Sequence, residues 1–152
     1  MGIKSITRIV GEWPSVSGPP LLLTNAVIAV PNHGEPHDYG KLLADFLMAR
    51  YNPTDQSLIS PRDWSPAQLA VDLIVFLVNH QLQPTLQADG VDHYAPWEYH
   101  INCRIQSLLD TFVPEVTICV FSGSGFRANT RNLSVDQFND WTLQSKLETE
   151  LP

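Results

Sequence analysis

The segment Leu69–Val78 constrains the fold more than any other part of the chain, because every residue in it except Asp72 is apolar. Strong helix-start signals precede it: Ser65 is followed by a proline, and Gln68 completes a capping box. These features predict a helix over residues 65–82. A helix that is apolar all round must be covered on every side, either by its own domain or by a neighbouring subunit.

The spacing of apolar residues places the other elements. Strands are predicted at 3–10, 21–30 and 115–121, and further helices at 38–51, 97–112 and 134–148. We expect the strand 21–30 to be buried on both faces for most of its length. The helix 97–112 is predicted from apolar residues at helical spacing, and the helix 134–148 from a second capping box, Ser134 with Gln137.

The order of these elements is two strands, three helices, a strand and a helix. It contains no alternating series of strands and helices that would build a parallel sheet. The sequence therefore predicts the α+β class, with a small sheet of about three strands covered by helices. With 152 residues, the chain has the length of a single domain, 1–152.

Charged residues are scarce: they make up 16% of the chain, and the net charge is −7. Negative charge argues against binding to nucleic acids or to anionic membrane lipids. No apolar run is long enough to span a bilayer, and the first residues lack the apolar run of a signal peptide. We therefore expect a cytoplasmic protein, or one in a particle assembled in the cytoplasm.

Two cysteines, Cys103 and Cys119, lie in apolar segments. Free cysteine in such a segment behaves as a small hydrophobic residue, so we expect two buried, reduced thiols. Neither thiol has a cation beside it in sequence except Arg104, and no G-x-S-x-G motif is present. The sequence therefore predicts no catalytic nucleophile.

The segment 33–38, His-Gly-Glu-Pro-His-Asp, is a candidate metal site. Its candidate ligands are His33, His37 and Asp38, with Glu35 beside them, because imidazoles and carboxylates bind metals. The spacing matches no zinc signature, and such a loop is also typical of a solvated turn in which His37 or Asp38 caps the following helix. No cofactor is predicted. Further ligands are available later in the chain: Asp92, His93, Glu98 and His100.

The segment Gly123–Ala128 fits the letters of a dinucleotide-binding fingerprint and follows a predicted strand. In that fingerprint the helix begins inside the motif, so that its N-terminus meets the phosphates. Here the next helix begins only at Ser134, so we expect a flexible loop. A weaker alternative is an anion held beside the loop by Arg127 and Arg131.

The stretch Asp63–Cys103 contains five acidic residues and no Lys or Arg in its 41 residues. It is either the buried centre of the domain or an acidic surface that meets a basic partner. The second interpretation would suit a small acidic immunity or inhibitor protein. A metal-dependent enzyme that uses His33 and His37 is another alternative.

The scarce charge and the apolar central helix favour a third function over both alternatives: a non-enzymatic structural subunit of a homo-oligomeric assembly. Its partners would be copies of itself and other proteins of the same assembly. The most concrete version is a ring or connector component of a phage or virus-like particle, by analogy of composition. We predict the interface on the last helix, at Phe138, Trp141 and Leu147, and expect the two aromatic side chains to be exposed.

Overall fold

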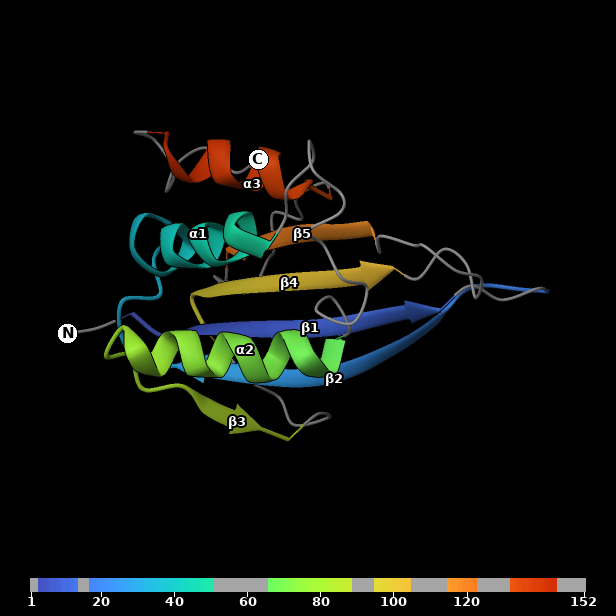
Figure 1. Ribbon diagram of the computed structural model, residues 1–152, viewed down its shortest axis with the longest axis horizontal. Helices are drawn as coiled ribbons and strands as arrows, with labels where there is room; N and C mark the ends of the chain where they lie inside the picture. The colour runs from blue at the N-terminus through green and yellow to red at the C-terminus, as the bar shows by residue number, and fades with distance from the viewer. Residues whose placement is uncertain are drawn as a thin grey trace.

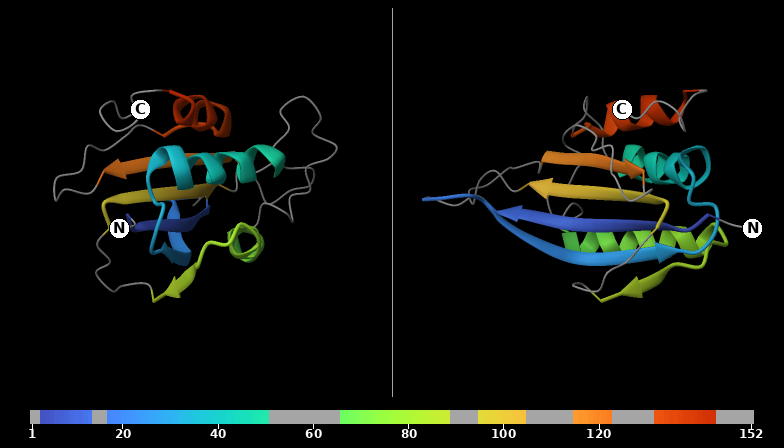
Figure 2. Two further views of the ribbon diagram at one scale, coloured as in Figure 1. Left: turned by 90° about the vertical axis from the view of Figure 1, so that its left-hand side faces the viewer. Right: turned by 180° about the vertical axis from the view of Figure 1, so that it is seen from behind.

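The computed structural model describes residues 3–13, 17–50, 66–88, 95–104, 115–122 and 132–144. Within these ranges the chain has a mixed α+β fold, as the sequence predicts. Figure 1 shows a twisted sheet with helices packed on one of its faces. Viewed from behind in Figure 2, the sheet lies in front of these helices.

Five strands form one sheet: β1 Ser5–Trp13, β2 Leu21–Val30, β3 Thr85–Gln87, β4 Trp97–Arg104 and β5 Glu115–Ser122. Their order across the sheet is β3-β2-β1-β4-β5. β1 pairs antiparallel with β2 and parallel with β4, so the sheet is mixed. The outer strands β3 and β5 pair antiparallel with β2 and β4.

The helical segments are a π-helical turn η1 Pro36–Gly40, α1 Lys41–Arg50, α2 Pro66–Asn79 and α3 Val135–Thr142. α1 and α2 lie on the same face of the sheet, and α3 lies beside α1 near the β5 edge (Figure 1, Figure 2). The predicted helices 38–51 and 65–82 are confirmed, the first as η1 followed by α1. Ser65 of the predicted capping box lies outside the described residues.

The core lies between the sheet and the helices. Alternate residues of each strand face the helices, and Ile9, Ile28 and Ile118 are fully buried there. The helices contribute fully buried side chains of their own: Leu43 and Leu47 from α1, Leu69, Leu73 and Leu77 from α2, and Phe138 from α3. Burial of these large apolar groups is the main force that holds the helices on the sheet.

The prediction of a helix at 97–112 is wrong for residues 97–104, which form β4. Trp97 and Ile101 are four residues apart, and this spacing places them on one face of a helix and also on one face of a strand. The alternation of Trp97, Tyr99, Ile101 and Cys103 with polar residues decides for the strand. Residues 105–112 lie outside the described part. β3 is a further strand that the sequence does not predict.

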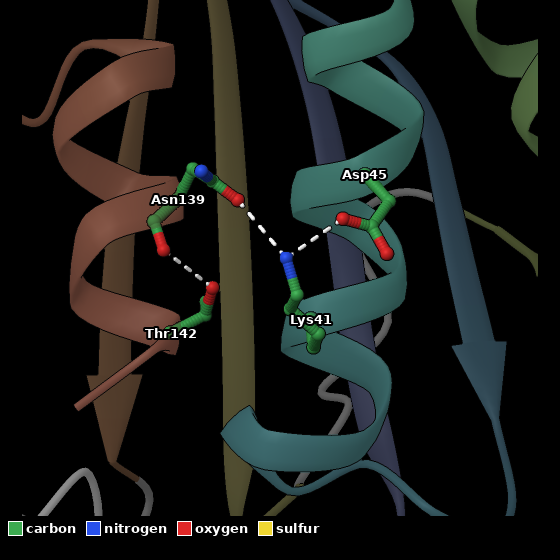
Figure 3. Close-up of polar contacts among 4 residues, drawn as sticks. All are labelled: Lys41, Asp45, Asn139 and Thr142. Atoms are coloured by element: carbon green, nitrogen blue, oxygen red, sulfur yellow. Dashed lines mark hydrogen bonds and ion pairs between the residues drawn. The ribbon is translucent and has the colours of Figure 1, made fainter. Parts of the chain in front are cut away.

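The predicted capping box at the start of α3 is confirmed. The Ser134 hydroxyl accepts a hydrogen bond from the backbone N–H of Gln137 at 3.2 Å, and the Gln137 side chain accepts one from the Ser134 N–H at 3.0 Å. Lys41 then links α1 to α3: its Nζ donates to Asp45 at 2.8 Å and to Asn139 at 3.2 Å (Figure 3).

The outer edge of β5 is occupied at its centre. Ile118 and Leu133 exchange two backbone hydrogen bonds, of 2.8 Å and 2.9 Å, so the segment before α3 adds a short bridge to this side of the sheet. Both side chains are buried.

Both cysteines are free and buried, as predicted. Burial raises the pKa of Cys103 to about 12, although the Arg50 guanidinium lowers it slightly. Burial also raises the pKa of Cys119, whose thiol donates to the Asn132 side chain at 2.6 Å. Neither thiol is activated as a nucleophile.

Candidate functional site

Helix α2 exposes apolar side chains to solvent. Val71, Val75 and Val78 are 56%, 54% and 57% exposed. Their spacing places them on one stripe along the outer face of the helix, opposite the leucines that enter the core. The sequence predicts that the central helix is apolar on all sides, and the described part of the domain covers only one of them.

A second apolar feature is the end of the β1–β2 hairpin, residues 11–13 and 21–23, which we call the arm (Figure 1). β4 pairs with β1 as far as Glu12, so only Trp13 and its partner Leu21 extend past the pairing with β4. Leu21, Leu22 and Leu23 are 56%, 62% and 50% exposed, and Trp13 is 37% exposed. A β-bulge at Ile9/Val10 interrupts the pairing of β1 with β2 at the base of the arm.

The arm adjoins the N-terminal end of α2. Gly11 and Leu23 pair across the arm, and Gly11 contacts α2 so closely that a Cβ there would lie 3.2 Å from the Pro66 side chain. Residues two positions apart share a face of a strand, so Trp13, Leu21 and Leu23 face the same side as α2. We call these three residues, together with Val71, Val75 and Val78, the apolar surface.

The exposure of the arm corrects one expectation. Strand 21–30 is not buried on both faces for most of its length, since only Ala26–Val30 is buried. This half lies between β1 and β3 and beneath α2, whereas nothing in the described part of the chain covers Leu21–Leu23. Leu86 of β3, which pairs with Ile28, is another exposed apolar residue, and it is 65% exposed.

Charge is nearly absent from the apolar surface. β2 contains no charged residue, and the only one in α2 is Asp72. Asp72 accepts hydrogen bonds from Arg50 at 2.7 Å and from Gln68 at 2.8 Å, so its charge is compensated within the domain. Glu98, another acid of the stretch 63–103, is buried on β4.

The structure brings most of the predicted metal ligands together. Glu35, His37 and Asp38 each place one ligand atom within 4.8 Å of the other two. His33 Nδ1 lies 3.7 Å from the Asp38 carboxylate. His37 and Asp38 are exposed, and Glu35 is half-buried. The three grouped residues offer one imidazole and two carboxylates, a donor set that suits zinc or manganese.

The backbone of this loop is held tightly. His33 has a φ of 63°, in the left-handed region. A Cβ on Gly34 would lie 2.7 Å from the carbonyl oxygen of Ile3, so only glycine fits beside β1. The Tyr99 hydroxyl donates to the Gly34 carbonyl at 2.9 Å. His37 and Asp38, the alternative caps, lie inside η1 rather than before it. The N-cap residue is Glu35, and its side chain makes no capping hydrogen bond.

A pocket of about 150 Å³ adjoins the histidine loop. It lies where the end of β2 meets the turn after α2, and its lining residues are Val30, Pro31, Asn32, His33, Gln81, Leu82 and Gln83. The pocket therefore shares only His33 with the group of candidate ligands.

The other candidate ligands do not join this group in the described part of the chain. Glu98 and His100 lie on β4, where His100 Nε2 is 3.8 Å from the Glu98 carboxylate. Asp92, His93 and the loop Gly123–Ala128 lie outside the described residues. The same holds for Arg127, Arg131 and Leu147.

The expectation that Phe138 and Trp141 are exposed is wrong. Phe138 is fully buried and Trp141 is nearly so, in the core between α3, α1 and the sheet. A short helix needs only a narrow apolar stripe to pack on one neighbour, and these two aromatic residues fill that stripe. The exposure of Leu21–Leu23 in the arm, by contrast, is not predicted from the sequence.

Comparison with protein-family models, with curated proteins and with solved structures found no match to this chain. Among the described residues, no helix combines the length and the apolar content needed to cross a membrane.

Proposed function

We propose that this protein is a structural subunit that assembles with copies of itself through the apolar surface. The observation that carries the proposal is the stripe Val71, Val75 and Val78, in which three β-branched apolar residues on one helix are each more than half exposed. Monomeric proteins rarely expose contiguous apolar patches of large size, and such patches mark interaction sites.

The charge distribution supports a second copy as the partner. Copies of a chain with a net charge of −7 repel one another over most of their surfaces. The six residues of the apolar surface are uncharged, so two copies meet there with the least repulsion. The one charged residue of the arm, Glu12, alternates with Gly11 and Trp13 on β1 and lies 3.9 Å from Arg104. The more specific form of the proposal, a ring or connector component of a phage or virus-like particle, rests on analogy of composition.

Sedimentation velocity of the full chain between about 1 and 100 µM tests the proposal. We expect a discrete oligomer. The variant Val71→Ser/Val75→Ser/Val78→Ser should weaken association more than a hundredfold. Each substitution removes about 1 kcal/mol of the free energy gained when the valine is buried in the interface. The matched control is Leu143→Ser at the end of α3, which removes an apolar side chain that is 64% exposed and lies outside the apolar surface. A monomer at every concentration would refute self-assembly.

A second candidate function, metal-dependent activity, is favoured by the group Glu35, His37 and Asp38. Calorimetric titration with Zn²⁺ or Mn²⁺ tests it. Binding should be lost in His37→Ala and in Asp38→Asn, while Asp45→Asn, an exposed carboxylate on α1, serves as the control. Equal affinity in all four proteins would exclude this group as the site.

A further inference from the structure

The outer edge of the arm is an open strand edge. β3 pairs only with residues 27–29 of β2, and no other described strand pairs with this side of β2. On its inner edge Leu21–Thr24 pairs with β1, and Asn25 is the extra residue of the bulge. On its outer edge the segment Leu21–Asn25 has no described partner. Outward N–H and C=O groups on such an edge are a template for another strand.

Natural edge strands are normally protected against this pairing by a lysine, a proline, an inward-pointing charge or a β-bulge. Leu21–Asn25 has no lysine, proline or charge: its sequence is Leu-Leu-Leu-Thr-Asn. The bulged residue is Asn25, at one end of the segment, so Leu21–Thr24 keeps the regular pairing of a strand. All three leucines are at least half exposed.

From these observations we infer that two copies of the chain join by antiparallel pairing of their Leu21–Asn25 edges about a two-fold axis. This inference rests on the proposed self-assembly and specifies its contact. Antiparallel pairing of identical edges is isologous, so one segment supplies both halves of the interface. Pairing would continue the sheet from one copy into the next.

The occupant is argued from the chemistry of the edge. A foreign strand would satisfy the same backbone groups, but the edge offers no charged side chain that could select one. A second copy brings the same three leucines, each of which needs cover, and its own Leu21–Asn25 edge carries no charge. In the joined sheet, Trp13, Leu21 and Leu23 of both copies face the same side, so that their side chains cover one another across the axis.

Amide hydrogen exchange of the wild-type chain at low and high concentration tests the inference. Edge pairing should slow exchange in residues 21–25 at least tenfold at high concentration, because outward N–H groups become hydrogen-bonded. A contact through side chains alone would leave these amides unprotected. Leu22→Lys restores the natural edge protection and should raise the dissociation constant at least tenfold, whereas Leu143→Lys should not.

The outcomes separate this inference from the proposed function. An oligomer with no protection of 21–25, or with full association in Leu22→Lys, overturns edge pairing and leaves self-assembly standing. A monomer at all concentrations overturns both. The Leu22 side chain lies outside the core, so the thermal unfolding of Leu22→Lys in dilute solution should match that of the wild type.

Discussion

Because the Cys103 thiol is buried, the free energy of unfolding of this domain should fall as the solution becomes alkaline. Burial raises its pKa from an ordinary value of 9.0 to about 12. A group with a higher pKa in the folded state holds its proton more tightly there than in the unfolded chain. Its contribution to stability is therefore complete below pH 9 and is lost as the pH rises from 9 to 12.

The size of this loss follows from the pKa difference. Each pH unit between the two values removes about 1.4 kcal/mol from the free energy of unfolding, so the loss is about 2 kcal/mol at pH 10.5. Buried Tyr39 and Tyr99, whose pKa values are also raised by burial, add to the loss above pH 10. The wild-type domain should thus unfold in alkali well before its arginines titrate.

Urea unfolding of the wild type and of Cys103→Ala at pH 7.5, 9 and 10.5 isolates the thiol. At pH 7.5 the alanine variant should be less stable by about 1–2 kcal/mol, because it leaves a small cavity. At pH 10.5 that deficit should vanish or reverse, since only the wild type carries the titrating group. Free-energy curves that stay parallel over this pH range would refute the assignment of a raised pKa to Cys103.

Four further substitutions test the packing. Ser134→Ala should cost about 0.5–2 kcal/mol and reduce amide protection within α3, because both capping-box hydrogen bonds are lost; unchanged exchange would contradict the cap. Leu73→Asp should lower the free energy of unfolding in urea by more than about 3 kcal/mol, because it buries an unpaired charge. Val75→Asp on the outer face should lower it by less than about 0.5 kcal/mol in a dilute monomer. Equal losses in the two variants would show that the faces of α2 are assigned wrongly. Lys41→Met should cost less than about 1 kcal/mol, because its ion pair with Asp45 is solvent-exposed.

The sequence predicts those parts of the fold in which local signals and packing agree. The α+β class, β1, β2 and β5, and the helices α1, α2 and α3 follow from capping residues and periodicity. β4 is missed because Trp97 and Ile101 satisfy the helical and the strand period equally well. Three-residue β3 carries too few residues for any period to show.

The candidate site is predicted less completely, for physical reasons. The outer face of α2 is foreseen, because a helix that is apolar on all sides needs more cover than one sheet provides. The arm is not foreseen, since consecutive leucines fit a fully buried strand as well as an exposed one. The feature that indicates it is length: ten residues is long for a strand, and half of β2 extends past β3. Glu35, His37 and Asp38 are close in space because they are close in sequence, whereas the position of His33 depends on its left-handed backbone.

The bridge between Ile118 and Leu133 limits how far such a sheet can grow. It occupies the centre of the β5 edge, so among the described strands the sheet accepts a new strand readily only on the side of β2 and β3. Under the inferred edge pairing, a second copy would occupy that side in both molecules, and the described strands would offer no further edge for growth into a fibre. Any assembly larger than a pair must then use the α2 stripe as a separate interface, and its size is set by the angle between the two contacts rather than by runaway strand addition.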